Sequence, residues 1–110
     1  MTFSTEKNGD KLRIRLQGEV DHHNAAEVRT RIDRILETEQ PEVFYFNLSG
    51  VSFCDSSGLG LVMGRMRKCG QIDAVLIVEA PSEAVMKILH IAGMDKLIRI
   101  ERSNGNGKAS

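Results

Sequence analysis

The hydrophobic and polar positions of the chain repeat with two different periods, which predict strands and helices in alternation. Residues 12–17 read L-R-I-R-L-Q, and apolar side chains at every second position are typical of a strand with one buried face. The N-G-D sequence at 8–10 favours a tight turn, so residues 3–7 are expected to form the other strand of a hairpin. The apolar runs V-F-Y-F-N-L at 43–48 and A-V-L-I-V at 74–78 predict two buried strands, the first covered on both faces.

Three further segments have apolar residues at helical spacing. The predicted stripes are Val28, Ile32, Ile35 and Leu36; Leu59, Val62, Met63 and Met66; and Val85, Ile88, Leu89 and Ala92. Either Asp21 or Asn24 can cap the first helix, and Asn24 with Glu27 has the spacing of a capping box. The other predicted caps and ends are Asp55 and Ser82 at the starts, and Pro41, Gly70 and Gly93 at the ends.

Together these segments predict one α/β domain over residues 1–102. A last strand at 97–100 completes a small mixed sheet of four to five strands, with the helices packed on it. The sequence S-N-G-N-G-K-A-S at 103–110 has no apolar residue to bury beyond one alanine, so we expect a disordered polar tail.

Charge and cysteine content exclude several classes of function. Fifteen basic residues balance fifteen acidic ones, so the chain lacks the basic surplus that is typical of proteins that bind nucleic acid directly. It also lacks an apolar stretch of about 18 residues and a secretory signal, so we expect a cytoplasmic protein without membrane contact. Cys54 and Cys69 have no metal-binding spacing, and we expect two reduced thiols and no metal site.

The sequence D-S-S-G-L-G at 55–60 is the strongest candidate for a functional site. Asp55 is placed to cap a helix, which puts Ser56 and Ser57 in the first turn, where free N–H groups and the helix dipole favour an anion. A phosphate on one of these serines would therefore be tolerated. The alternative is that Asp, Ser and Gly only make a good helix start. Gly60 and Gly64, one turn apart, leave a bare stripe that another backbone, either the sheet beneath or a partner above, could approach.

Enzymatic sites fit the sequence poorly. The glycines read G-x-G-x-x-x-G and lie after the predicted helix start, so they do not match the fingerprint of a dinucleotide-dependent oxidoreductase. The G-x-S-x-G motif of the serine hydrolases is also missing.

Several motifs together resemble the anti-sigma-factor antagonists, which are small single-domain proteins of the STAS family. They are G-E-V-D-H-H at 18–23, D-S-S-G-L-G at 55–60, G-R at 64–65 and the segment at 84–100. The resemblance covers nearly the whole chain and implies that residues 1–102 form a STAS domain.

The resemblance implies a regulatory protein without enzymatic activity or cofactor. Such proteins bind an anti-sigma factor that is also an ATP-dependent serine kinase, and so release its sigma factor. The kinase phosphorylates the serine that follows the motif aspartate, here Ser56, which ends binding, and a serine phosphatase reverses the modification. The residues expected to bind the partner are Asp21, His22, His23, Asn24, Asp55, Ser57, Gly58, Leu59 and Gly60.

Two further expectations concern the glycines of the 55–60 motif and an alternative function. We interpret Gly58 and Gly60 as positions without side chains that let a kinase reach the hydroxyl of Ser56. The alternative function is a STAS-type regulatory module that binds a small ligand or nucleotide, because the same fold occurs in sensors and in the tails of transporters.

Overall fold

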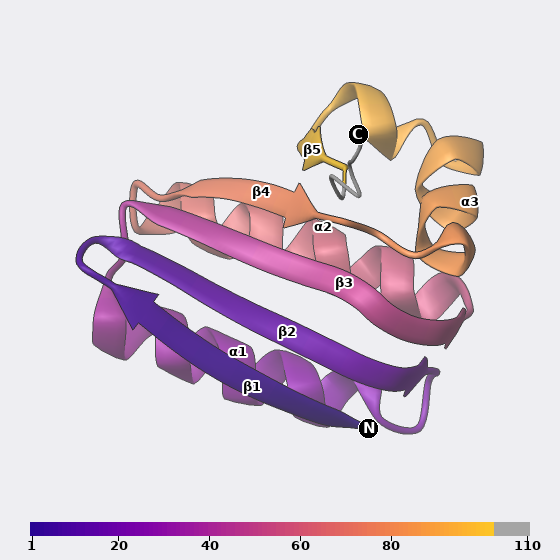
Figure 1. Ribbon diagram of the computed structural model, residues 1–110, viewed down its shortest axis with the longest axis horizontal. Coiled ribbons are helices and arrows are strands. Elements are labelled where there is room, and N and C mark those ends of the chain that lie inside the picture. Colours follow the sequence, from indigo (N-terminus) through magenta and orange to yellow (C-terminus); the bar gives the residue numbers. More distant parts are fainter. Residues whose placement is uncertain (103–110) are drawn as a thin grey trace.

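The structure is a computed structural model that describes residues 1–102, with one mixed sheet in the order β1-β2-β3-β4-β5 (Figure 1). β1 is antiparallel to β2, and all other neighbouring strands are parallel. The elements are β1 (Thr2–Asn8), β2 (Lys11–Val20), α1 (Ala25–Glu39), β3 (Val43–Cys54), α2 (Ser56–Gln71), β4 (Val75–Glu79), α3 (Glu83–Ile91), the 3₁₀ helix η1 (Met94–Lys96) and β5 (Arg99–Glu101). The predicted α/β fold is confirmed, and the tail predicted at 103–110 lies outside the described residues.

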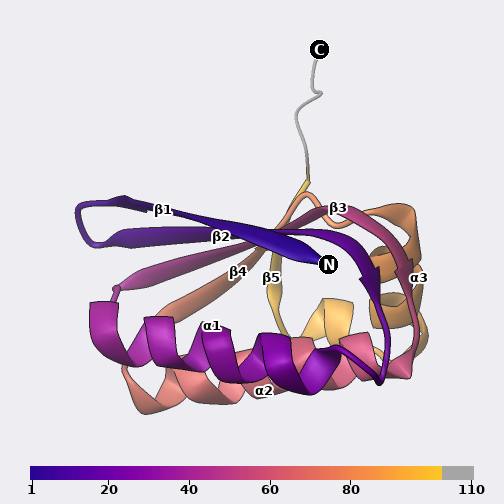
Figure 2. The ribbon, with the colours of Figure 1, turned by 90° about the horizontal axis from the view of Figure 1, so that it is seen from below.

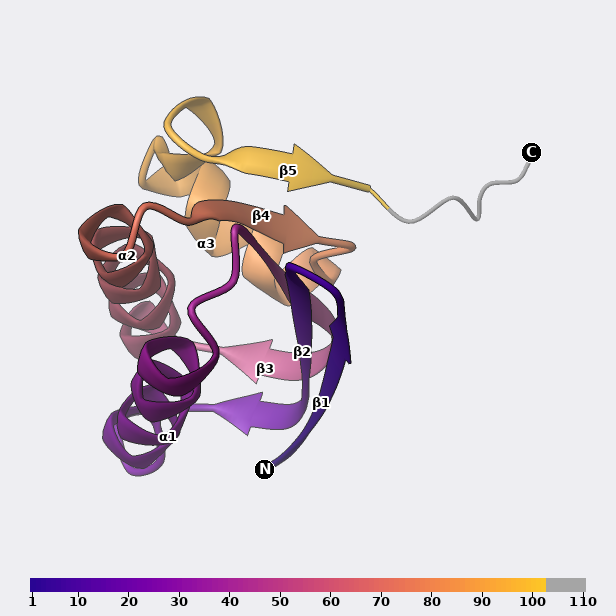
Figure 3. The ribbon, with the colours of Figure 1, turned by 90° about the vertical axis from the view of Figure 1, so that its left-hand side faces the viewer.

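Helices α1 and α2 lie side by side on one face of the sheet, and α3 lies at its end (Figures 2 and 3). Leu12, Ile14 and Leu16 of β2 are fully buried beneath the helices, as their alternation predicts. The predicted hairpin turn is confirmed, because Asn8 pairs with Lys11. The core is completed by Val28, Ile32 and Leu36 of α1, Phe44 and Phe46 of β3, Val78 of β4 and Leu89 of α3.

No helix of residues 1–102 covers the opposite face of the sheet, so the prediction that β3 is covered on both faces is wrong (Figure 2). Phe44 and Phe46 of β3 are buried in the core. Tyr45 between them is half-buried beneath Arg13, whose guanidinium carbon lies 4.9 Å from the centroid of the Tyr45 ring. The continuous run at 43–48 therefore combines a core face with a second face that is covered by long polar side chains, which also bury apolar surface with their stems.

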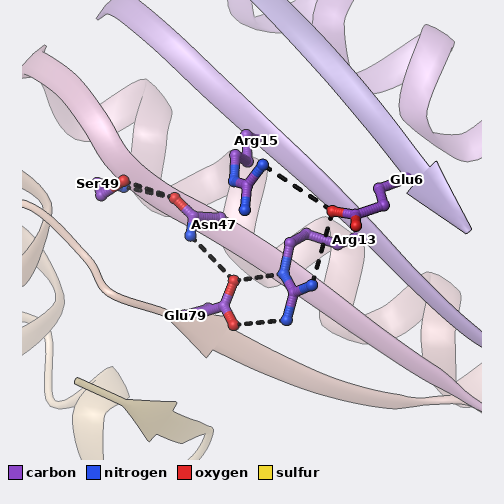
Figure 4. Close-up of polar contacts among 6 residues, drawn as sticks. All are labelled: Glu6, Arg13, Arg15, Asn47, Ser49 and Glu79. Atoms are coloured by element: carbon purple, nitrogen blue, oxygen red, sulfur yellow. Dashed lines mark hydrogen bonds and ion pairs between the residues drawn. The ribbon is translucent and has the colours of Figure 1, made fainter. Parts of the chain in front are cut away.

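Polar side chains join β2, β3 and β4 on this open face (Figure 4). Arg13 donates two hydrogen bonds to Glu79, from Nε to Oε1 at 2.7 Å and from Nη2 to Oε2 at 2.9 Å. Asn47 Nδ2 donates to Glu79 Oε1 at 2.9 Å, and Asn47 Oδ1 accepts from the backbone N–H and the hydroxyl of Ser49. The network satisfies the polar groups of Asn47, which is 8% exposed.

This network makes the stability of the domain sensitive to acid. The hydrogen bonds from Arg13 hold the pKa of Glu79 below its ordinary value of 4.5, with a smaller contribution from Asn47. The stabilisation is therefore complete above pH 4.5 and is lost as the pH falls through the lower pKa of the folded state. We expect Glu79→Gln to be less stable than wild type at neutral pH and to lose less stability on acidification, as measured by urea unfolding across this range. Parallel pH curves for the two proteins would contradict this.

Helix α2 packs most of its predicted stripe against the core, because Val62 is buried and Leu59 and Met66 are partly buried there. Its buried residues are Gly58, Leu61, Val62, Arg65 and Cys69, whereas Met63 is 40% exposed. The helix also continues to Gln71, so Gly70 lies within it and does not end it. Arg65, which is not part of the predicted apolar stripe, is also buried and lies in the contact with α1.

Arg65 is held by Asp33 of α1. Its side chain is 3% exposed, and its Nη2 donates to Asp33 Oδ2 at 3.1 Å. Its Nε lies 2.8 Å from Asp33 Oδ1, at an angle that leaves these two atoms without an aligned hydrogen bond. Burial lowers the pKa of Arg65, and the charge of Asp33 opposes this effect. A charged residue that the predicted apolar stripe does not include is thus buried between α1 and α2.

Strand β3 extends to Cys54, beyond the predicted end at 48, and this extension positions the candidate site. Its register with β2 shifts twice, and Gly50 lies at one shift, where a Cβ atom would be 2.7 Å from the Cγ of Gln17. Beyond the shifts Val20 pairs with Cys54, so β2 and β3 end side by side. The residues that follow the two strands therefore begin at the same edge of the sheet.

Candidate functional site

The two motifs singled out in the sequence follow these paired strand ends. Asp21 comes directly after Val20, and Asp55 comes directly after Cys54, whose strands pair in register. The backbone N–H of Asp55 donates to the carbonyl of Val20 at 3.2 Å and fixes the second motif to the end of β2. This edge lies at the carboxyl ends of parallel strands, where functional residues of α/β sheets usually gather.

Asp55 caps α2, as the sequence predicts. Its backbone is extended, with φ −97° and ψ −167°, and its Oδ1 accepts a hydrogen bond from the N–H of Ser57 at 2.8 Å. Ser56 is the first residue of the helix and is exposed, whereas Ser57 is half-buried. The hydroxyl of Ser56 is therefore presented to solvent at the positive end of the helix dipole.

Asp21 and Asn24 hold the turn between β2 and α1 reciprocally. Asp21 Oδ1 accepts from the N–H groups of His23 and Asn24, at 2.9 and 3.2 Å, and Asn24 Oδ1 accepts from the N–H of Asp21 at 3.1 Å. Asn24 occupies the N-cap position but its side chain makes no capping bond to α1, so the predicted capping box with Glu27 is wrong. The side chains of His22 and His23 remain exposed, with ring centroids 4.0 Å apart.

A hollow of about 260 Å³ brings the two motifs together. It is lined by His22, Ala25, Ala26 and Arg29 from the first segment and by Ser57, Gly60 and Leu61 from the second. Leu59 packs partly against the core beside it. Candidate residues that are 30 or more positions apart in the sequence thus share one surface. They are neighbours across the hollow without direct bonding, because no hydrogen bond joins His22 to Ser57 within residues 1–102.

The structure gives Gly58 a different role from the one interpreted from the sequence. Gly58 is buried, and a Cβ atom there would lie 2.0 Å from the Sγ of Cys54. Its missing side chain therefore makes room for Cys54 and does not open the way to Ser56. At Gly60, by contrast, a Cβ atom would meet nothing within 4 Å, which agrees with an open approach.

We expect Gly58→Ala to destabilise the domain by about 1–3 kcal/mol, the usual cost of inserting a methyl group into a packed site. Because the methyl group would meet Cys54 Sγ, the variant Gly58→Ala/Cys54→Ala should recover most of this loss. Chemical denaturation of the four proteins of this cycle measures the coupling. Gly60→Ala, in the same helix turn but open to solvent, serves as the control. An unchanged stability of Gly58→Ala would contradict the packing role.

Two exposed residues near the motifs, Phe53 and Arg29, escape the sequence analysis. Phe53 is 50% exposed at the end of β3, two residues before Asp55. An aromatic residue two positions before the motif is a signal that a longer predicted strand would have revealed. Arg29 lies four residues before Asp33, a spacing that allows an ion pair within a helix, but Asp33 pairs with Arg65, and Arg29 lines the hollow.

The chemistry available at this surface is recognition and modification of an exposed hydroxyl. Within residues 1–102, His, Cys, Asp and Glu side chains do not gather in threes around a possible metal position. Burial raises the pKa of Cys54, and the charge of Asp55 adds to this effect, so its thiol is a poor nucleophile. None of the helices in residues 1–102 is long and apolar enough to cross a membrane.

Comparison with known proteins places the chain and its fold in one family. The STAS domain profile matches residues 2–106, and the chain belongs to the STAS domain family. The relatives share both the sequence and the fold. An anti-sigma F factor antagonist of Lysinibacillus sphaericus is 38% identical over 81 residues, which cover 74% of this chain and 69% of that protein.

Two solved structures of SpoIIAA, an anti-sigma factor antagonist from Bacillus, are also similar. Its unphosphorylated form matches with a TM-score of 0.77 and 30% identity, covering 94% of this chain and 91% of that one. Its phosphorylated form matches with a TM-score of 0.71 and 30% identity, covering 94% and 95%. The five-stranded mixed sheet with three α-helices is thus the fold of both forms of this regulator.

Proposed function

We propose that this protein is an anti-sigma factor antagonist that is switched by phosphorylation of Ser56. The observation that carries the proposal is the exposed hydroxyl of Ser56, directly after the capping residue Asp55 and on one surface with the Asp21–Asn24 turn. In its unphosphorylated form the protein binds an anti-sigma factor through this surface, and the sigma factor is released.

Ser56 is a better acceptor than Ser57 because of its surroundings. Ser56 is exposed, whereas Ser57 is half-buried in the hollow beside His22. The N–H of Ser57 donates a hydrogen bond to Asp55, which holds the first turn of α2 in place while a kinase phosphorylates the hydroxyl of Ser56. Ser56 is also the first residue of α2, where the positive end of the helix dipole favours a phosphate.

The similar proteins support the regulatory role. The relative from Lysinibacillus sphaericus is an anti-sigma F factor antagonist, and SpoIIAA is known in both unphosphorylated and phosphorylated forms. For this chain we propose a cytoplasmic protein without enzymatic activity. Its first partner is an anti-sigma factor that is also a serine kinase and brings the ATP for phosphorylation. Its second partner is a serine phosphatase that restores the unphosphorylated form, which binds the anti-sigma factor.

Kinase labelling tests the acceptor. Incubation with purified anti-sigma F factor and radiolabelled ATP should label the wild type and Ser57→Ala, whereas Ser56→Ala should remain unlabelled. Ser57→Ala is the matched control, because it removes the neighbouring hydroxyl of the same turn. Labelling that survives Ser56→Ala would contradict the assignment.

Binding by the same purified anti-sigma factor tests the function itself. Ser56→Ala should bind like wild type, because it loses one exposed hydroxyl and no core contact. If neither protein binds, while a nucleotide or other small ligand binds the isolated chain tightly, the alternative of a ligand-binding STAS module replaces the proposal.

A further inference from the structure

A second, larger hollow continues along the two helices from the candidate site. This α1–α2 groove has a volume of about 440 Å³. Its lining includes Arg29 and Asp33 of α1, and Gly60, Gly64, Arg67 and Gln71 of α2. Arg29 and Gly60 also line the hollow at Ser57, so the two hollows form one continuous surface. The groove therefore begins beside the proposed phosphorylation site.

The two glycines that weaken α2 face this groove. A Cβ atom at Gly60 or Gly64 would meet nothing within 4 Å, so the sheet does not need either glycine. Gly58 in the same helix is different, because Cys54 leaves no room for a side chain there. Each glycine within a helix costs about 1 kcal/mol relative to alanine. The fold itself thus gives no reason for Gly60 and Gly64.

The groove also has a surplus of positive charge. The carboxylate of Asp33 forms an ion pair with Arg65, and the carboxylate of Glu37 forms an ion pair with Lys68. Arg29 and Arg67 have no ion pair or hydrogen bond with another side chain of residues 1–102. The charge of Arg29 also contributes to the lowered pKa of Arg65, so these like charges are close enough to repel each other. An anionic group in the groove beside Arg29 would offset this repulsion.

We propose that the α1–α2 groove receives an acidic helix of the anti-sigma partner. The backbone of that helix packs against Gly60 and Gly64, where the absence of side chains permits a short distance between helix axes. Its carboxylates pair with Arg29 and Arg67. The inference rests on the proposed function, and it names the partner segment that the same surface binds.

An acidic occupant also explains how a phosphate on Ser56 opposes binding. The groove and the hollow at Ser57 are continuous through Arg29 and Gly60. A phosphate at the start of α2 would place about −1.5 to −2 charges near the end of a negatively charged helix. Repulsion between the two anions then adds to the loss of fit at the hydroxyl.

The glycine arm of the test compares the same substitution inside and outside the groove. Gly60→Ala/Gly64→Ala should bind the purified anti-sigma factor about tenfold more weakly, because two methyl groups enter a close contact. Its melting temperature should equal or exceed that of wild type, because alanine favours the helix. Gly70→Ala is the matched control: it lies in α2 with nothing within 4 Å but outside the groove, and it should bind like wild type.

The charge arm changes the two arginines without adding bulk. Arg29→Gln/Arg67→Gln should weaken binding about tenfold at low salt and make the affinity less sensitive to salt. Arg34→Gln, an exposed arginine of α1 outside the groove, is the control and should bind like wild type. Both arms are measured by calorimetric titration.

The outcomes distinguish a failure of the groove proposal from a failure of the proposed function. If the groove variants bind like wild type while phosphorylation of Ser56 still ends binding, the groove proposal is wrong and the proposed function stands. If wild type itself does not bind the anti-sigma factor, both are overturned. Weaker binding by the groove variants, with unchanged binding by Gly70→Ala and Arg34→Gln, supports the groove as the docking site.

Discussion

Phosphorylation of Ser56 is expected to weaken the binding of the anti-sigma factor by about a hundredfold or more, which corresponds to about 2.7 kcal/mol. The partner would have to bury a dianion against a surface that fits a neutral hydroxyl. The domain itself has no such cost. Ser56 is exposed at the start of α2, where a negative charge is stabilising by about 0.3–1 kcal/mol. The melting temperature of the phosphorylated protein should therefore equal or slightly exceed that of the unmodified one.

Calorimetric titration and thermal melts of the two forms measure these effects, and Ser56→Ala is the control for loss of the hydroxyl alone. Amide spectra should differ mainly in residues 20–24 and 53–62, which lie around the shared edge of β2 and β3. Changes spread over α3 and β5 would mean that phosphorylation rearranges the whole domain, and the local switch would then be wrong.

The second large effect concerns the ion pair between α1 and α2. We expect Asp33→Ala to destabilise the domain by about 3 kcal/mol, because it leaves the guanidinium of Arg65 buried without its counter-charge. Arg65 is 3% exposed at its side chain, whereas Asp33 is 27% exposed. Arg65→Met should therefore cost less than Asp33→Ala, because a partly exposed carboxylate can regain water.

Denaturant unfolding of the two single variants and of Asp33→Ala/Arg65→Met tests this asymmetry. The double variant should recover most of the stability lost in Asp33→Ala. Glu37→Ala is the control in the same helix contact, because Glu37 is 61% exposed and its solvent-screened pair with Lys68 should contribute little to stability. A loss in Asp33→Ala no larger than the loss in Glu37→Ala would contradict a buried pair.

Local sequence features account for the parts of the fold that depend on neighbours in the chain. The alternation in β2 predicts its buried face, and the capping roles of Asp55 and Ser82 are confirmed by hydrogen bonds within three residues. Gly93, predicted to end α3, adopts a left-handed conformation with φ 75° just after it. These features follow from backbone geometry and period, which the sequence displays directly.

The interpretation of the glycines needed the folded structure. Gly58, Gly60 and Gly64 are identical residues in one helix, yet Gly58 is buried against Cys54 and the other two face an open groove. Helical spacing places Gly60 and Gly64 on one face, but it cannot say whether that face meets the sheet or solvent. Only the packing of α2 against α1 and β3 decides this.

The sequence alone determined the order of elements, the mixed α/β class and the pair of motifs that define the candidate site. Each of these depends on residues that are close in the chain or on a motif read as a unit. The tertiary structure alone decided that one face of the sheet is open and that Arg65 is buried. Arg65 is buried because Asp33, 32 residues away, supplies its counter-charge. Tyr45 is only half-buried, beneath Arg13, because no helix of residues 1–102 returns to that side. Such pairings over long separations leave no periodic signal, so only the folded chain reveals them.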